Sequence, residues 1–286
     1  MRILVTNDDG IDSEGLAVLS KAMSEIGDVT VAAPDREYSG ASASLGALQM
    51  LRPEVHRRAI DGAAEAWSIE GPPALCVMFA TLGVFEHRFD MVVAGINPGV
   101  NVGRTIYHSG TVGAALTARS RGIPAVAVSQ AVEGFGIEGQ GWEKMLTGME
   151  WESAAQVAVC VAGALAERKS KRPILVNLNI PNLSLSEMNG WERTSIGRVP
   201  PRVVADARLE AIEGRSSSYK IVMEWGDTVE LPPGTDGGAV EAGSVSLCLL
   251  GHLTDIDTPP DHSDEEAAYP ALADALDALM KPGAAG

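Results

Sequence analysis

The sequence predicts an α/β fold in which helices cover both faces of a mostly parallel, doubly wound sheet. Short apolar runs rich in strand-forming residues alternate with longer segments whose apolar residues recur at helical spacing. Alternation of this kind produces βαβ units, and successive βαβ units place their strands parallel. The chain has 286 residues, of which 45% are hydrophobic, so it can bury a sizeable core.

The first 180 residues supply these units in order. The apolar run that ends at Asp8 is the first strand, and Ser13 can cap the helix that follows to about residue 27. Further strands are expected at residues 29–33, 67–69, 91–96, 125–128 and 174–180. Helices are expected at residues 74–82, 109–121 and 151–168, with a possible extended segment at 45–51 and a long loop at 130–148.

The sequence pattern changes near residue 182. Residues 190–250 contain extended segments, at 219–225 and 244–250, between Gly- and Pro-rich turns, and show no clear helix. The acidic and then Ala/Leu-rich stretch at 261–279 predicts a C-terminal helix. We therefore expect a catalytic core at residues 1–182, a β-hairpin-rich oligomerisation extension at 183–254 and an acidic tail at 255–286.

Composition limits the function. The net charge of −16 disfavours binding to nucleic acid or to anionic membranes, because such binding relies on clustered Lys and Arg. The three cysteines are scattered, so a disulfide framework or a zinc site is not expected. No apolar run reaches the roughly 18 residues of a membrane-spanning helix, and a cytoplasmic protein is expected.

Polar residues at the ends of three predicted strands indicate a metal site. Asp8 and Asp9 end the first strand, Ser39 follows the second, and Asn97 follows the strand at 91–96. The carboxyl ends of parallel strands share one edge of a doubly wound sheet, where ligands bind, so the four side chains can meet there. Their carboxylate, hydroxyl and amide oxygens suit a hard divalent cation. Taken singly, each also fits a turn or an exposed loop.

A second group of residues indicates an anion site. Gly99 and Gly103 allow close backbone approach, and the run Ser109, Gly110, Thr111 begins a predicted helix with unpaired N–H groups. Helix N-termini bind phosphate in this way, although the same run also makes an ordinary helix cap. These glycines do not form a G-x-G-x-x-G fingerprint, the chain contains no G-x-x-x-x-G-K-[ST], and Ser39 does not lie in a G-x-S-x-G sequence, which disfavours a dinucleotide cofactor and an acyl hydrolase.

At these residues the chain resembles the SurE (survival protein E) family of metal-dependent nucleoside-monophosphate phosphatases. The resemblance extends over about residues 1 to 254, and its motifs are residues 6–11 (TNDDGI), 33–36 (APDR) with 39–42 (SGAS), 95–103 (GINPGVNVG), 109–115 (SGTVGAA), and 235–236 (TD) with 243–246 (GSVS).

The resemblance implies a Rossmann-like fold whose β-rich extension is exchanged between the subunits of a dimer or tetramer. It implies that Asp8, Asp9, Ser39 and Asn97 bind one divalent ion, and that Asn101 and the turn Ser109, Gly110, Thr111 hold the phosphate. It also implies hydrolysis of nucleoside 5′- and 3′-monophosphates, with shortening of polyphosphate by some members.

The chain departs from the family pattern at several positions around the substrate. Pro72 and Leu75 stand where the family usually has Thr and Asp, and Tyr38 stands where Arg is frequent. Arg104 replaces a common acidic residue, and His108 replaces the usual aromatic residue before Ser109. These departures leave the substrate preference open.

The sequence thus predicts a Mg²⁺- or Mn²⁺-dependent phosphomonoesterase, a 5′/3′-nucleotidase, with Asp8 and Asp9 as catalytic residues. Either carboxylate could orient the attacking water as well as ligate the ion. Two alternatives stay open: Asp8 as a nucleophile that forms an aspartyl phosphate, and a nucleotide sensor without turnover. The expected partners are a small phosphorylated substrate and further copies of the chain.

Overall fold

The computed structural model describes residues 1–46, 52–133, 142–167, 172–198, 204–227 and 229–251. The elements in chain order are β1 (Arg2–Thr6), α1 (Glu14–Met23), β2 (Asp28–Pro34), β3 (Val55–Arg58), β4 (Ala63–Ile69), α2 (Pro73–Thr81), β5 (Met91–Pro98), the 3₁₀ helix η1 (Gly103–Tyr107), α3 (Gly110–Ser120), β6 (Ala125–Gln130), α4 (Trp142–Met145), α5 (Trp151–Glu167), β7 (Leu175–Ile180), β8 (Trp191–Arg193), β9 (Val204–Ala211), β10 (Tyr219–Trp225), α6 (Asp236–Glu241) and β11 (Val245–Leu249).

A nine-stranded sheet with the order β3-β4-β2-β1-β5-β6-β7-β11-β8 is the centre of the fold. The six strands from β4 to β7 pair parallel, while β3 and β11 pair antiparallel with their inner neighbours. The strand order runs outward in both directions from β1 and β5, which makes this pair the topological switch point where α/β proteins bind ligands. The predicted fold class is confirmed.

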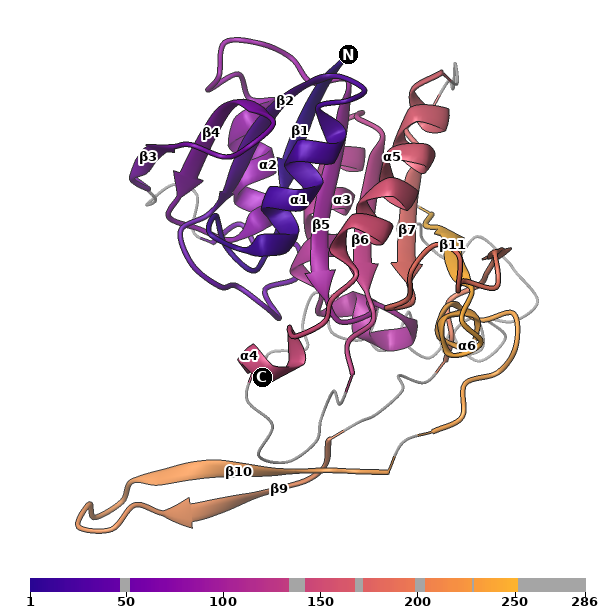
Figure 1. Ribbon diagram of the computed structural model, residues 1–286. Helices are drawn as coiled ribbons and strands as arrows, with labels where there is room; N and C mark the ends of the chain where they lie inside the picture. The colour runs from indigo at the N-terminus through magenta and orange to yellow at the C-terminus, as the bar shows by residue number, and fades with distance from the viewer. Residues whose placement is uncertain (47–51, 134–141, 168–171, 199–203, 228, 252–286) are drawn as a thin grey trace, which may run out of the picture. The chain divides into compact units, whose positions relative to one another are not determined.

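Helices cover both faces of this sheet, with α1 and α5 in front of it and α2 and α3 behind it in Figure 1. Strand β1 shows why the sequence requires both layers, because every residue of its apolar run is buried. Ile3 and Val5 belong to the core cluster under α1 and α5, whereas Leu4 belongs to the cluster under α2 and α3. A continuous apolar strand of this kind is typical of a sheet covered on both faces.

Most predicted elements are confirmed, with boundaries that shift by a few residues. Helix α1 ends at Met23, earlier than the expected residue 27, and β4 is longer than the predicted 67–69 strand. The prediction missed β3, η1, β8, β9 and the short helix α4 inside the expected loop. The prediction of no clear helix in 190–250 was wrong, because Thr235 caps the six-residue helix α6 by accepting a hydrogen bond from the Gly238 N–H at 3.2 Å. A helix this short leaves almost no periodic pattern in the sequence.

Residues 183–251 contribute to the main sheet and also form a separate ribbon. Strand β11 pairs with β7 and with β8, at one edge of the nine-stranded sheet. Strands β9 and β10 pair only with each other, as an antiparallel hairpin. The described part of the chain, Met1–Leu250, forms one compact unit, so the division into a core at 1–182 and an extension at 183–254 stays a prediction.

The predicted C-terminal helix at 261–279 and most of the possible extended segment at 45–51 lie outside the described residues. Within the described ranges, no helix is long and apolar enough to cross a membrane.

Candidate functional site

A cavity of about 530 Å³ lies beyond the carboxyl ends of β1 and β5. Five of the residues that the sequence analysis selected line it together, although they come from three different strand ends and from the start of α3: Asp8, Ser39, Asn97, Asn101 and Ser109. Asp9 lines a neighbouring cavity of about 380 Å³, and Pro98 lies between the two because it lines both. The acidic pair therefore separates two adjoining spaces, with Asp8 facing one and Asp9 the other.

The N-terminus of α3 holds the carboxylate of Asp8. The Thr111 hydroxyl donates a hydrogen bond of 2.5 Å to Asp8 Oδ1. A Cβ atom on Gly110 would lie only 2.7 Å from Asp8 Oδ2, so glycine is needed for this close approach. Gly110 and Thr111, which were predicted to bind phosphate, thus contact Asp8 and do not line the larger cavity. Ser109 does line it, while its Oγ caps α3 by accepting a hydrogen bond from the Val112 N–H at 3.1 Å.

Backbone contacts position the loop that carries Ser39. The Tyr38 N–H donates to the Asp8 carbonyl oxygen at 2.7 Å, and the Ser42 N–H donates to the His108 carbonyl oxygen at 3.1 Å. Gly10 has a φ of +101°, and a Cβ atom there would lie 3.1 Å from the Arg36 carbonyl carbon. The loop after β2 is therefore fixed to both the Asp8 turn and the start of α3, which brings Ser39 to the cavity.

Asn97 lies near the end of β5, and Asn101 lies on the loop that follows this strand. Asn97 donates from Nδ2 to the Gly99 carbonyl oxygen at 2.6 Å, so its Oδ1 is the atom able to act as a metal ligand. Asn101 Nδ2 donates to Ser129 Oγ at 2.8 Å. The backbone N–H of Asn101 donates to Asn179 Oδ1 at 2.7 Å, and its carbonyl oxygen accepts from Asn177 Nδ2 at 2.9 Å.

The sequence analysis missed Asn177, Asn179 and Ser129, which are all fully buried. A signal for the two asparagines is present in the sequence, because they alternate with apolar residues in β7 and so point to one face of the sheet. Buried polar side chains normally find partners, and these find theirs in the loop that carries Asn101.

The carboxylates of Asp8 and Asp9, in the turn after β1, lie in an environment that a positive charge would stabilise. Burial raises the pKa of Asp8, against the opposing hydrogen bond from Thr111. Burial, together with the nearby carboxylates of Asp8 and Glu37, raises the pKa of Asp9 to about 8. Both carboxylate oxygens of Asp9 are buried without a hydrogen-bond partner among the described residues. A divalent cation would supply the missing partner, so the residues fit such an ion.

The larger cavity has an acidic lining. Asp8, Glu37 and Glu241 line it, and none of the described residues that line it is Lys or Arg. The described residues contain no group of three or more His, Cys, Asp or Glu side chains arranged to hold a metal ion. A cation at the predicted position would therefore depend on the neutral oxygens of Ser39 and Asn97 as well as on the two carboxylates.

The stability of the protein is expected to depend on pH when divalent ions are removed. An aspartate has a pKa of about 3.9 in an unfolded chain, whereas that of Asp9 in the fold is about 8. The folded state therefore retains a proton that the unfolded state has lost, and the free energy of unfolding falls as the pH rises through this window. Thermal unfolding in EDTA at pH 5 and pH 8 measures the fall. Asp9→Asn should make it less steep, and an equal fall in that variant would contradict the assignment.

The departures from the family pattern lie in different environments. His108 lines the larger cavity. Pro72 precedes the first residue of α2, and Leu75 is only 1% exposed, so both belong to the packing of that helix. Arg36 lies over the ring of Tyr38, with its guanidinium carbon 5.1 Å from the ring centroid. Arg104 is exposed on η1. Of these residues, His108 is the one placed to touch a ligand in the cavity.

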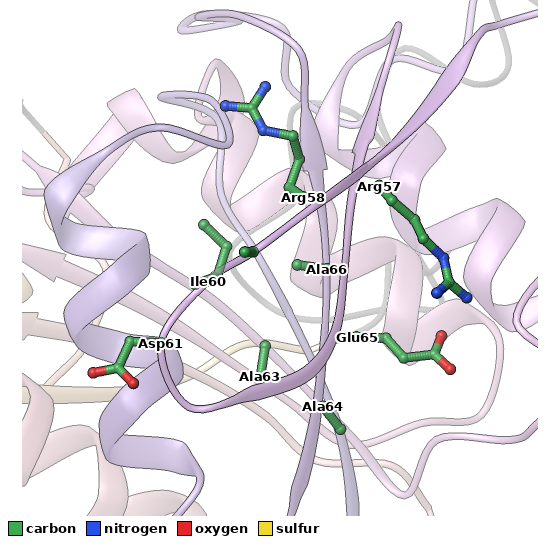
Figure 2. Close-up of a pocket in the computed structure, with 9 residues that line it drawn as sticks. Arg57, Arg58, Ile60, Asp61, Ala63, Ala64, Glu65 and Ala66 are labelled. Carbon is green, nitrogen blue, oxygen red and sulfur yellow. The ribbon is translucent and has the colours of Figure 1, made fainter.

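A different cavity, of about 440 Å³, lies at β3 and β4, and Figure 2 shows the charged side chains that line it. Arg58 forms an ion pair with Asp12, and Arg57 lies over the ring of Trp67 at 4.7 Å. Asp61 pairs with Lys21 at 3.4 Å, and Glu65 accepts a hydrogen bond from the Trp67 indole. Because these charges are satisfied within the protein, the larger cavity at the switch point is the better candidate for function.

Comparison with known proteins identifies the family of the chain. The family model described as "Survival protein SurE" matches residues 3–201. A protein named 5′-nucleotidase SurE from Coxiella burnetii (strain RSA 331 / Henzerling II) is 36% identical over 254 residues, which cover 87% of this chain and 88% of the relative. The protein of the same name from strain Dugway 5J108-111 is 35% identical over 250 residues, with the same coverage. The crystal structure of the SurE protein from Aquifex aeolicus is similar with a TM-score of 0.68 and 30% identity, covering 95% of this chain and 100% of that one.

Proposed function

The chain belongs to the SurE family, and we propose from this premise that it is a divalent-metal-dependent phosphomonoesterase that hydrolyses nucleoside monophosphates to a nucleoside and phosphate. The observation that carries the proposal is the convergence of Asp8, Ser39, Asn97, Asn101 and Ser109 on one cavity at the switch point of the sheet. The relatives are named 5′-nucleotidases, and we extend the proposal to 3′-monophosphates because of the resemblance in the motifs.

The acidic cavity supports a requirement for a cation. A phosphate dianion would be repelled by Asp8, Glu37 and Glu241 unless a positive charge lay between them, and the described lining contains no cationic side chain. We propose that Asp8, Asp9, Ser39 and Asn97 hold one Mg²⁺ or Mn²⁺ ion. Such an ion supplies polarisation of the phosphoryl oxygens and lowers the pKa of a nearby water molecule.

The side chains around the proposed ion have separate roles in the reaction. Asp8 is oriented by Thr111 and by the start of α3, so that its carboxylate keeps one position during the reaction. Asp9, whose oxygens have no other partner among the described residues, can accept a proton from the attacking water. Asn101 and Ser109 supply hydrogen bonds to the phosphate, because they lie on the lining beside Asp8. The nucleoside then faces the apolar part of the lining, formed by Val100, Val132, Leu231 and Val240.

A panel of phosphate esters tests this function. Release of inorganic phosphate is expected from 5′-AMP and 3′-AMP in the presence of Mg²⁺ or Mn²⁺, with loss of turnover in EDTA and recovery when the ion is added back. Nucleotide binding without product would indicate the sensor. Turnover that persists in EDTA after extensive dialysis would contradict the metal-dependent scheme. An acid-stable phosphorylated protein in the quenched reaction would indicate an aspartyl phosphate at Asp8 instead.

We also propose that the chain associates with itself through the β9–β10 hairpin. The register places six apolar residues on one face of the ribbon, and all six are exposed: Ala207, Leu209, Ala211, Tyr219, Ile221 and Met223. The other face carries the ion pairs Arg208–Glu224 and Lys220–Glu210. A two-stranded ribbon is marginally stable alone, and an exposed apolar face marks an interaction surface. A second copy of the chain, in a dimer or tetramer, would cover this face.

A further inference from the structure

Asp236 is a fully buried carboxylate that holds three segments of the chain together. Its Oδ2 accepts a hydrogen bond from the backbone N–H of Gly103 at 2.9 Å. Its Oδ1 accepts from the N–H of Gly197 at 2.8 Å and from that of Gly237 at 3.0 Å. Hydrogen bonds to a charged acceptor are roughly twice as strong as neutral ones, and they take the place of a cationic side chain here.

Two of these donors lie at the two ends of the segment that contains the β9–β10 hairpin. Gly197 precedes the hairpin, and Gly237 follows it in the first turn of α6. The same two ends are joined by further backbone bonds, from the Ser195 N–H to the Gly234 carbonyl oxygen at 3.1 Å and from the Asp236 N–H to the Ser195 carbonyl oxygen at 2.9 Å. Asp236 therefore lies at the base of the hairpin segment.

The third donor adjoins the wall of the candidate active site. Gly103 begins η1 and follows Asn101 by two residues, and residues 97–101 line the 530 Å³ cavity. The opposite part of the lining includes Gly237, Val240 and Glu241 of α6. These two walls also pack directly, because a Cβ atom on Gly237 would lie 3.4 Å from Val102 Cγ2. The carboxylate of Asp236 thus fixes the spacing between the two walls.

We propose that Asp236 is a positioning residue for nucleotide binding, which holds the segment between β5 and η1 against α6 and ties both to the base of the hairpin. This inference rests on the proposed function of the cavity. Asp236 does not line the cavity and touches no reacting group, so its effect is expected in substrate affinity and not in the chemical step.

Asp236→Asn tests the inference, because it keeps the size of the side chain but replaces one acceptor oxygen with an NH₂ group that faces a backbone N–H. We expect the KM for 5′-AMP to rise about tenfold through displacement of the loop, with kcat within about twofold of that of the unaltered chain. Asp206→Asn is the matched control, since Asp206 is an exposed acid on β9 whose carboxylate bonds the adjacent Ala207 N–H. It should leave both constants and the assembly unchanged.

The outcomes separate this inference from the proposed function. If the unaltered chain releases no phosphate from 5′-AMP, the proposed function fails. If it turns over 5′-AMP and Asp236→Asn has the same KM, or loses kcat alone, only the positioning role fails. If Asp236→Asn does not fold, amide hydrogen exchange of the unaltered chain tests the positioning role instead. Protection of the Gly103 and Gly197 amides above that of the exposed hairpin supports the inference, and exchange as fast as in the hairpin overturns it.

Discussion

Asp8→Asn is expected to reduce phosphate release from 5′-AMP by about 10²- to 10³-fold, while the protein stays folded. The variant keeps an oxygen that can accept the hydrogen bond of Thr111, so the start of α3 should remain in place. What it loses is the negative charge that holds the divalent ion at the switch point. Because burial disfavours the charged form of Asp8, the variant should be at least as stable as the unaltered chain in EDTA.

The measurements are steady-state turnover with Mn²⁺ and thermal unfolding with and without the ion. Asp12→Asn is the matched control, since Asp12 lies four residues away on the surface, where its side chain is 72% exposed and pairs with Arg58. It should retain turnover within about twofold, as surface pairs contribute little. Comparable turnover in Asp8→Asn and Asp12→Asn would show that Asp8 has no role in catalysis. If Mn²⁺ stabilises Asp8→Asn as strongly as it stabilises the unaltered chain, Asp8 is not a ligand of the metal ion.

Ile221→Asp is expected to weaken self-association by about two orders of magnitude, through a charge placed in the apolar face of the hairpin. Ile221 is 69% exposed in the single chain, and in the register it lies opposite Leu209, which is 67% exposed. Sedimentation equilibrium over a range of protein concentrations would show the shift from dimer or tetramer to monomer. The folded core should be unaffected, because β9 and β10 pair only with each other.

Val222→Asp provides the matched control for this effect. Val222 is the next residue on β10, and it lies opposite Arg208 on the polar face of the ribbon. An aspartate there faces an arginine and leaves the apolar face intact, so the assembly should persist. Equal association of the two variants would show that the apolar face is not the interface. A monomeric unaltered chain would contradict the self-association proposal.

The sequence alone predicted the fold class and most of the residues around the candidate site. Both follow from short stretches of chain: the apolar run of β1 is buried on both faces, and the polar residues that follow β1, β2 and β5 necessarily share the edge of a parallel sheet. The sequence therefore predicts that Asp8, Ser39 and Asn97 lie close together, and they line one cavity. Their role as metal ligands stays a prediction.

Only the tertiary structure decided which groups hold these residues in place. Thr111 is 103 residues from Asp8, Asn179 is 78 from Asn101, and Asp236 is 133 from Gly103, yet each pair is joined by a hydrogen bond. Local periodicity gives no information about such pairs, because they depend on strand order, on register and on the angle at which α3 and α6 meet the sheet. The sequence could place the chemically active side chains at one edge, whereas their orientation depends on donors and acceptors that only the completed fold brings within hydrogen-bond distance.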